Sequence, residues 1–100
     1  MHIYMYNKTV KIEWDESKRR TNLHKHGLDF QDAHAVLAGA TLLIPDERYE
    51  YGESRYTSIG LLRNIVVVVV HTLSGGNVRV ISMRKATRYE TELFFANLGD

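Results

Sequence analysis

The sequence predicts an α+β domain built around a three-strand antiparallel meander. Three apolar segments, at 55–62, 65–73 and 78–83, are rich in β-branched residues and are separated by junctions of only a few residues. Junctions this short connect antiparallel strands as hairpins. The middle segment contains five consecutive valines, which is typical of a strand covered on both faces. We therefore place this strand inside the sheet.

Capping residues predict two helices before the meander. Asp15 is suited to cap a helix over 16–26, which is acidic at its start and basic at its end, and Gly27 is suited to stop it. Asp29 can cap a second helix over 30–38, whose apolar residues recur at helical spacing. The two helices are expected to form a compact pair.

A third helix is predicted over 88–97, after the meander. Thr87 and Glu90 have the spacing of a capping box, in which each side chain accepts a hydrogen bond from a backbone N–H near the helix start. The apolar side of this helix is expected to comprise Tyr89, Leu93 and either Phe94 or Ala96.

Two shorter strands and an N-terminal segment complete the expected order. Residues 11–14 alternate between polar and apolar, as in a half-buried strand. Residues 41–44 are apolar and partly β-branched, and Pro45 is expected to end that strand and to disfavour a central position. Residues 1–10 are expected to form an extra edge strand or a flexible extension.

Composition is that of an ordinary globular protein, with 44% apolar residues in a chain of 100. We expect a single domain over 1–100. The absence of cysteine excludes disulfides and thiolate metal sites, and no other side chains have a convincing metal-ligand spacing, so no cofactor is expected. No apolar run approaches the roughly 18 residues of a membrane span, and the N-terminus lacks a signal-peptide pattern. These features favour a cytoplasmic protein with no membrane partner.

Charge is distributed unevenly, although 13 basic and 12 acidic side chains nearly cancel. Basic residues cluster near both ends of the chain and acidic residues cluster in its middle. The basic clusters could bind an anionic partner and the acidic cluster a basic one. Alternatively, these clusters are ordinary solvated surface.

The hairpins also predict which side chains share a face of the sheet. If residues 63 and 64 form a two-residue turn, Arg55 lies opposite Thr72, and the next hairpin places Thr72 opposite Arg79. These three side chains then point to one face, with Glu53 just beyond on the same side. His71 would point to the opposite face. Because a histidine that ends an apolar strand is unusual, His71 is a candidate acid or base.

The same strand register separates Arg84 from Arg55 and Arg79. In a regular strand it points to the face of His71, and it lies about 13 Å along its strand from Val80. A bulge would reverse its side. On the first predicted helix, Lys18, Asn22, Lys25 and His26 share one polar face at helical spacing. This face is either a binding surface or a solvated one.

Arginines on a rigid sheet suit a phosphodiester. A planar guanidinium can hold two phosphate oxygens and can stabilise the negative charge that grows in a transition state. RNA carries its own nucleophile, because a 2′-hydroxyl can attack the adjacent phosphate once a base removes its proton. Glycine-rich phosphate loops and serine nucleophile motifs are absent from the sequence, so nucleotide hydrolysis has little support.

A series of short motifs runs from residue 11 to residue 93. They are Trp14-Asp15-Glu16-Ser17-Lys18, Asn22, Lys25-His26-Gly27-Leu28-Asp29-Phe30, Tyr51-Gly52-Glu53-Ser54-Arg55, Ile59-Gly60, Val69-Val70-His71-Thr72 and Arg79-Val80-Ile81-Ser82-Met83-Arg84-Lys85-Ala86-Thr87. Their order and spacing resemble the BrnT family of bacterial toxins. Residues 1–10 precede the usual start of such proteins.

This resemblance implies a RelE-like fold and a ribonuclease that cleaves RNA and arrests translation and growth. It also implies a cognate BrnA-type antitoxin with a ribbon-helix-helix part, in a hetero-oligomer that contacts operator DNA only through the antitoxin. By the same resemblance, Arg55 and Arg84 are the foremost phosphate-stabilising candidates. Further candidates are Lys25, His26, Glu53, His71 and Arg79, with Lys18 on the same helix face as Lys25. The acid or base role of His71 is an inference from its position, not from the family motif.

Two alternatives to a ribonuclease stay open. The same basic surface could belong to a non-catalytic module that binds nucleic acid or an antitoxin segment. Alternatively, Arg55 and Arg79 could form a salt-bridge network with Glu53, which would contribute little stability at an exposed site.

Overall fold

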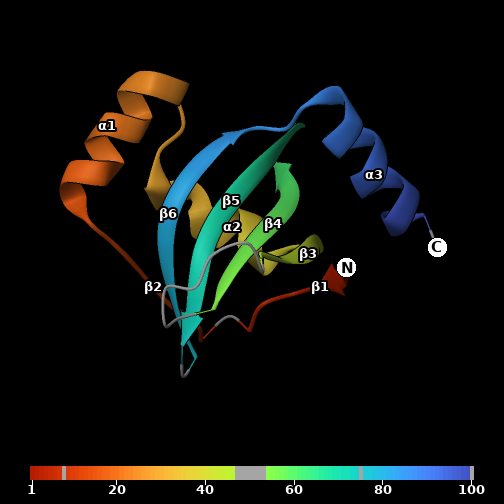
Figure 1. Ribbon diagram of the computed structural model, residues 1–100, viewed down its shortest axis with the longest axis horizontal. Coiled ribbons are helices and arrows are strands. Elements are labelled where there is room, and N and C mark those ends of the chain that lie inside the picture. The colour runs from red at the N-terminus through yellow and green to blue at the C-terminus, as the bar shows by residue number, and fades with distance from the viewer. Residues whose placement is uncertain (8, 47–53, 75, 100) are drawn as a thin grey trace.

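A computed structural model describes residues 1–7, 9–46, 54–74 and 76–99. The described part forms a six-stranded sheet in the order β1-β3-β4-β5-β6-β2, flanked by helices (Figure 1). The strands are β1 (His2–Tyr4), β2 (Lys11–Trp14), β3 (Thr41–Asp46), β4 (Arg55–Leu62), β5 (Ile65–Ser74) and β6 (Asn77–Lys85). The helices are α1 (Glu16–His26), a 3-10 helix (Phe30–Asp32), α2 (Ala33–Ala38) and α3 (Arg88–Leu98). The α+β class is confirmed, but the sheet is mixed, because β2 pairs parallel to β6.

The predicted meander register is confirmed. Arg55 lies opposite Thr72, and Thr72 lies opposite Arg79. The junction between β4 and β5 turns at Arg63, which has a positive φ of 57°, while Gly76 after β5 has a φ of 85°. Gly75, the other residue expected in that turn, lies outside the described residues. Short turns therefore fixed the pairing, as expected.

A bulge in β6 corrects the prediction for Arg84. Val70 pairs with Ser82, but the next residue, His71, pairs with Val80, so Ile81 is the extra residue of the bulge. An extra residue reverses the alternation of side chains beyond it. Arg84 consequently pairs with Val68 and belongs to the face of Thr72, not to the face of His71.

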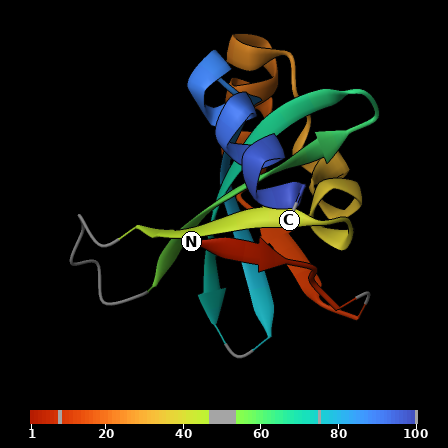
Figure 2. The same ribbon diagram turned by 90° about the vertical axis from the view of Figure 1, so that its right-hand side faces the viewer.

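The sheet has a hydrophobic layer on each face. On the face of His71, Phe30, Val36 and Leu37 pack with valines of β5 in the larger core. On the opposite face, Phe94 of α3 packs over Val68 in a smaller core. Figure 2 shows α3 lying across the β3 side of the sheet, whereas Figure 1 shows α1 beside β6 at the other side. The two helices α1 and α3 therefore lie at opposite sides of the sheet.

Three predicted elements differ from the structure in detail. β3 continues through Pro45 to Asp46, and this is tolerated because β1 pairs only with residues 41–43 and leaves Pro45 unpaired on that side. The second predicted helix divides into the 3-10 turn and α2. Tyr89 is 70% exposed, so Phe94 is the buried residue of α3. No described helix is long and apolar enough to cross a membrane.

The N-terminal segment is an integral part of the sheet. β1 forms an edge strand over residues 2–4, antiparallel to β3. After β1 the Tyr6 N–H donates to the Leu37 carbonyl (3.1 Å), and the Tyr6 side chain is 4% exposed. Burial raises the pKa of Tyr6 to about 12. The segment thus contributes a core residue.

Candidate functional site

Asn22 fixes helix α1 beside the sheet. β2 pairs only with residues 77–80 of β6. On this edge of β6 the backbone of Met83 therefore faces α1, while its other edge pairs with β5. The Asn22 amide accepts from the Met83 N–H (3.2 Å) and donates to the Met83 carbonyl (2.9 Å) and the Leu28 carbonyl (3.1 Å). The helical spacing predicts Asn22 on a polar face of the helix, but the structure shows it as a buried anchor.

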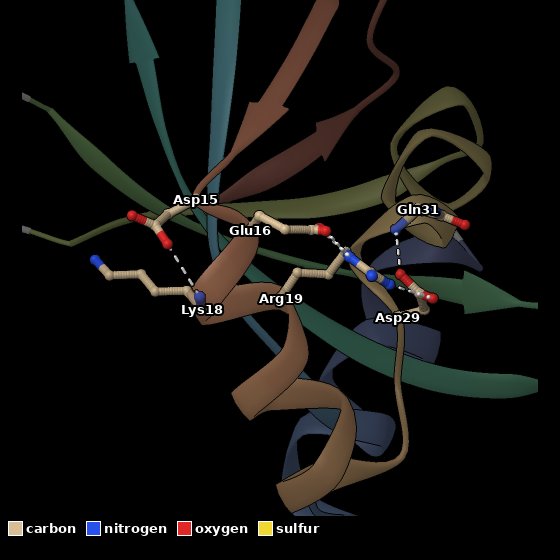
Figure 3. A network of polar contacts seen from close by, with 6 residues as sticks. All are labelled: Asp15, Glu16, Lys18, Arg19, Asp29 and Gln31. Carbon is tan, nitrogen blue, oxygen red and sulfur yellow. Dashed lines mark hydrogen bonds and ion pairs between the residues drawn. The ribbon is translucent and has the colours of Figure 1, made fainter.

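The first turn of α1 is held on both sides (Figure 3). The Asp15 carboxylate caps the helix by accepting from the Lys18 N–H (3.1 Å). Arg19 forms ion pairs with Glu16 and with Asp29, the latter at 3.0 Å. Figure 3 shows the Lys18 side chain extending on the side of the helix away from Arg19. These contacts leave Lys18 directed away from the ion-pair network.

A small hollow on the α3 face of the sheet is lined by Lys18, Arg55 and Arg79, together with Thr72 and Ile81. Its volume is about 50 Å³, and we call it the central hollow. The cross-strand register explains how Arg55 and Arg79 meet over Thr72, and α1 supplies Lys18 from the side. Within the described part of the chain, Lys18 and Arg79 form no side-chain ion pair. The hollow therefore gathers positive charge.

A second hollow of about 270 Å³ continues along α1, and we call it the helix hollow. It shares Lys18 and Ile81 with the central hollow and adds Lys25, His26 and Ser82. The predicted polar face of α1 thus lines this surface. We call the central hollow and the helix hollow together the groove. The groove is lined by Lys18, Lys25 and His26 of α1 and by Arg55 and Arg79 of the sheet.

Arg84 is on the same face but outside the central hollow. Val68, its partner on β5, lies four residues from Thr72, which corresponds to about 13 Å along the strand. The Arg84 guanidinium makes two hydrogen bonds to Glu90 of α3, at 2.7 and 2.9 Å. This pairing lowers the pKa of Glu90 to about 2. Arg84 therefore joins α3 to the sheet.

His71 lies in the core on the opposite face and is fully buried. Its Nε2 is 3.0 Å from the Tyr6 hydroxyl and 2.9 Å from the Ser58 hydroxyl, and its Nδ1 is 3.0 Å from the Thr72 carbonyl. The carbonyl can only accept, so Nδ1 carries the proton and Nε2 accepts. Burial lowers the pKa of His71. The structure does not bring His71 together with the arginines.

The remaining predicted site residue, Glu53, lies outside the described residues. The predicted site residues do not include Glu13, which is the parallel-strand partner of Arg79. The alternation of polar and apolar residues in β2 predicts that Glu13 faces away from the core, but only the pairing of β2 with β6 places it next to an arginine. Within the described part of the chain, no group of three or more His, Asp or Glu residues could hold a metal ion.

This arrangement can bind a phosphodiester. Two guanidinium groups and an ammonium group around one hollow offer several charge-assisted hydrogen bonds to phosphate oxygens. Their mutual repulsion decreases when an anion binds between them. The helix hollow adds an amine and an imidazole, which are able to transfer protons.

A family model described as "Ribonuclease toxin, BrnT, of type II toxin-antitoxin system" matches residues 14–90 of the chain. The chain belongs to the BrnT family. It is thus a ribonuclease toxin of a type II toxin-antitoxin system, and such a toxin has a protein antitoxin as partner. A search of curated proteins finds no match. Almost all of β2 and the whole of β1 precede the matched region of this BrnT chain.

Proposed function

We propose that this BrnT protein is a metal-independent endoribonuclease with a RelE-like site, in which the central hollow holds the scissile phosphate. The observation that carries this proposal is the meeting of Lys18, Arg55 and Arg79 around one hollow. Three cations, with no carboxylate among the described residues that line the hollow, suit a group whose charge grows during the reaction. RNA is the substrate class that supplies its own nucleophile.

In the proposed reaction, the 2′-oxygen forms a bond to phosphorus while the bond from phosphorus to the 5′-oxygen breaks. The products are a 2′,3′-cyclic phosphate and a free 5′-hydroxyl. One group takes the 2′-hydroxyl proton and another donates a proton to the leaving 5′-oxygen. We propose Lys25 and His26 in the helix hollow for this proton transfer, with Glu53 as a further candidate.

His71 and Arg84 have other tasks in this proposal. His71 is fully buried on the opposite face, so it holds the carbonyl of Thr72 instead of contacting RNA. Arg84 is engaged by Glu90 and positions α3. Phosphate contact by Arg84, as implied by the family resemblance, is the competing assignment.

Cleavage by purified protein tests the mechanism. A single-stranded RNA should be cut with EDTA present, and the same sequence should resist when each 2′-hydroxyl is replaced by hydrogen. Cleavage of that deoxy substrate would overturn the 2′-hydroxyl mechanism. Loss of RNA cleavage in EDTA, restored by a divalent metal, would overturn metal independence.

Charge removal tests the site. R55A and R79A should each lower the cleavage rate by about 100-fold, as expected for loss of a preorganised charge at the transition state. R88A is the matched control, because Arg88 lies on α3, has a 93% exposed side chain and pairs only with Glu92 in the described part of the chain. Undiminished cleavage by the R55A/R79A double variant would show that the site is misplaced. RNA binding without cleavage by the wild type would indicate a non-catalytic binding module.

We also propose a BrnA-type antitoxin with a ribbon-helix-helix part as the cognate partner in the cytoplasm. The basic groove suits an acidic antitoxin segment that competes with RNA. Expression of this protein alone should arrest growth and translation, and co-expression of the antitoxin should restore both. The pair, and not the toxin alone, should bind operator DNA.

A further inference from the structure

The groove has a third hollow, beyond Arg79. This hollow is open, has a volume of about 320 Å³ and is lined by Glu13, Trp14, Asp15 and Arg79, and we call it the strand hollow. It shares Arg79 with the central hollow, just as the helix hollow shares Lys18. The strand hollow, the central hollow and the helix hollow therefore adjoin one another in this order. The strand hollow has no task in the reaction proposed above.

Register places Glu13 in one line with the arginines. The pairs Arg55–Thr72, Thr72–Arg79 and Arg79–Glu13 form a row across four strands. Ile12 and Trp14 pack against the larger core, so the alternation of β2 directs Glu13 to the face of Arg79. Glu13 is exposed, and its side chain forms no ion pair in the part of the chain that the structure describes.

The spacing of this row distinguishes two tasks for Glu13. Two strand spacings, or about 10 Å, separate the backbone of Glu13 from that of Thr72 beneath the central hollow. A 2′-oxygen lies close to its own phosphorus, whereas the edge of a nucleobase lies a whole ribose and ring away. The position of Glu13 therefore suits contact with a base better than proton abstraction from the 2′-hydroxyl.

A carboxylate selects among bases by the donors they present. Ionised Glu13 has two acceptor oxygens and no donor. Guanine presents two adjacent donors on its Watson–Crick edge, N1–H and the 2-amino group, which match the two oxygens. Adenine and cytosine each present one amino group beside an acceptor nitrogen, which would face the second oxygen with repulsion. Uracil presents a single N–H between two carbonyl acceptors.

We propose that the strand hollow is a nucleobase subsite in which Glu13 selects guanine next to the cleaved phosphate. Arg79 serves both hollows, because it contacts the phosphate on one side and borders the base on the other. This inference rests on the proposed function, since it assigns a sequence preference to the same groove. A bidentate contact to a base edge discriminates by about 10-fold or more.

Four short RNAs that differ only in the base next to one cleavable linkage provide the test. The wild type should cleave the guanine substrate about 10-fold faster than the others. E13Q replaces one acceptor by a donor, so it should lose this preference, and its rate on the guanine substrate should fall to the level of its rates on the other three. E92Q, which removes an exposed carboxylate from α3, is the matched control and should keep the preference. Inosine, which lacks the 2-amino group, should reduce the preference, whereas 7-deazaguanosine should preserve it.

Two results would overturn the subsite. One is an equal fall in all four rates in E13Q, which would assign Glu13 to the chemical step or to folding. The other is an unchanged guanine preference in that variant. Calorimetry with guanosine 3′-monophosphate and adenosine 3′-monophosphate separates this inference from the proposed function, because it requires no cleavage. Preferred binding of the guanosine compound, lost in E13Q, would support the subsite even in a protein that does not cut RNA.

Discussion

The two ends of β6 each carry an arginine on the same face of the sheet, but the two arginines have opposite surroundings. Arg79 lies beside Arg55 and Lys18 and forms no ion pair in the described part of the chain. Arg84 is held by both oxygens of Glu90. Arg84 joins two elements of the fold through its pair with Glu90, whereas the positive charges of Lys18 and Arg79 repel each other beside the central hollow. This difference supports the proposed binding of an anion at the Arg79 end.

Replacing Arg79 and Arg84 one at a time should give the largest effects on cleavage and stability. R79A should lower RNA cleavage about 100-fold and leave the free energy of unfolding unchanged or slightly higher, because a like charge is removed. R84M keeps the apolar stem but loses the pair with Glu90, so it should cost about 1 kcal/mol of stability and retain cleavage within a few-fold. Cleavage rates and denaturant unfolding of both variants provide the measurement.

The reverse result would exchange the assignments. If R84M lowers cleavage as strongly as R79A without loss of stability, Arg84 contacts the phosphate, as the family resemblance implies. The pair with Glu90 would then have to open when RNA binds.

Loss of the α1 anchor should have the next largest effect, because α1 supplies Lys18 to the central hollow but takes no part in the pair between Arg84 and Glu90. N22A leaves the Met83 N–H and carbonyl without their buried partner, which should cost about 2 kcal/mol. Because α1 supplies Lys18, Lys25 and His26, cleavage should fall as well, even under conditions where the variant is folded.

Asn97 provides the matched control for this variant. Among the described residues its side chain donates only to the Leu93 carbonyl within α3, so N97A should cost less and should leave cleavage unchanged. Equal effects of N22A and N97A on cleavage would contradict a role for Asn22 in positioning the groove.

The pH dependence of stability should show the smallest effect. The pKa of Glu90 is about 2 in the folded protein, below its ordinary value of 4.5. The stability that the pair contributes is therefore present above pH 4.5 and is lost as the pH falls from 4.5 towards 2. E90Q should be less stable at neutral pH and should lack this part of the pH dependence.

E92Q is the control for the pH experiment, because the pair of Glu92 with Arg88 is exposed and contributes little. Its unfolding free energy should follow the wild type from pH 5 to pH 2. In the wild type and in E92Q, His71 causes a further loss of stability at higher pH. Because its pKa is lowered in the folded protein, the unfolded chain binds this proton more readily as the pH falls below about 6.5. An E90Q curve parallel to that of the wild type between pH 4.5 and 2 would contradict the assignment to Glu90.

The local elements and the pairing of the meander are predictable from the sequence. Capping residues place α1 and α3 within a residue of their observed bounds, because a cap is a hydrogen bond between near neighbours in the chain. Short turns likewise determine that Arg55 and Arg79 flank Thr72, since a two-residue loop leaves a single register. The sequence alone therefore groups the side chain of Arg79 with that of Arg55.

Three features follow from long-range packing and are not predictable from the sequence: the side of Arg84, the burial of His71 beneath Tyr6, and the presence of Glu13 at the groove. The bulge at Ile81 has no local marker in the sequence, and it reverses Arg84. Tyr6 meets His71 across 65 residues, and Glu13 meets Arg79 across 66 residues through parallel pairing. Contacts between such distant segments depend on how helices and edge strands pack on the sheet, because neighbouring residues alone do not bring them together.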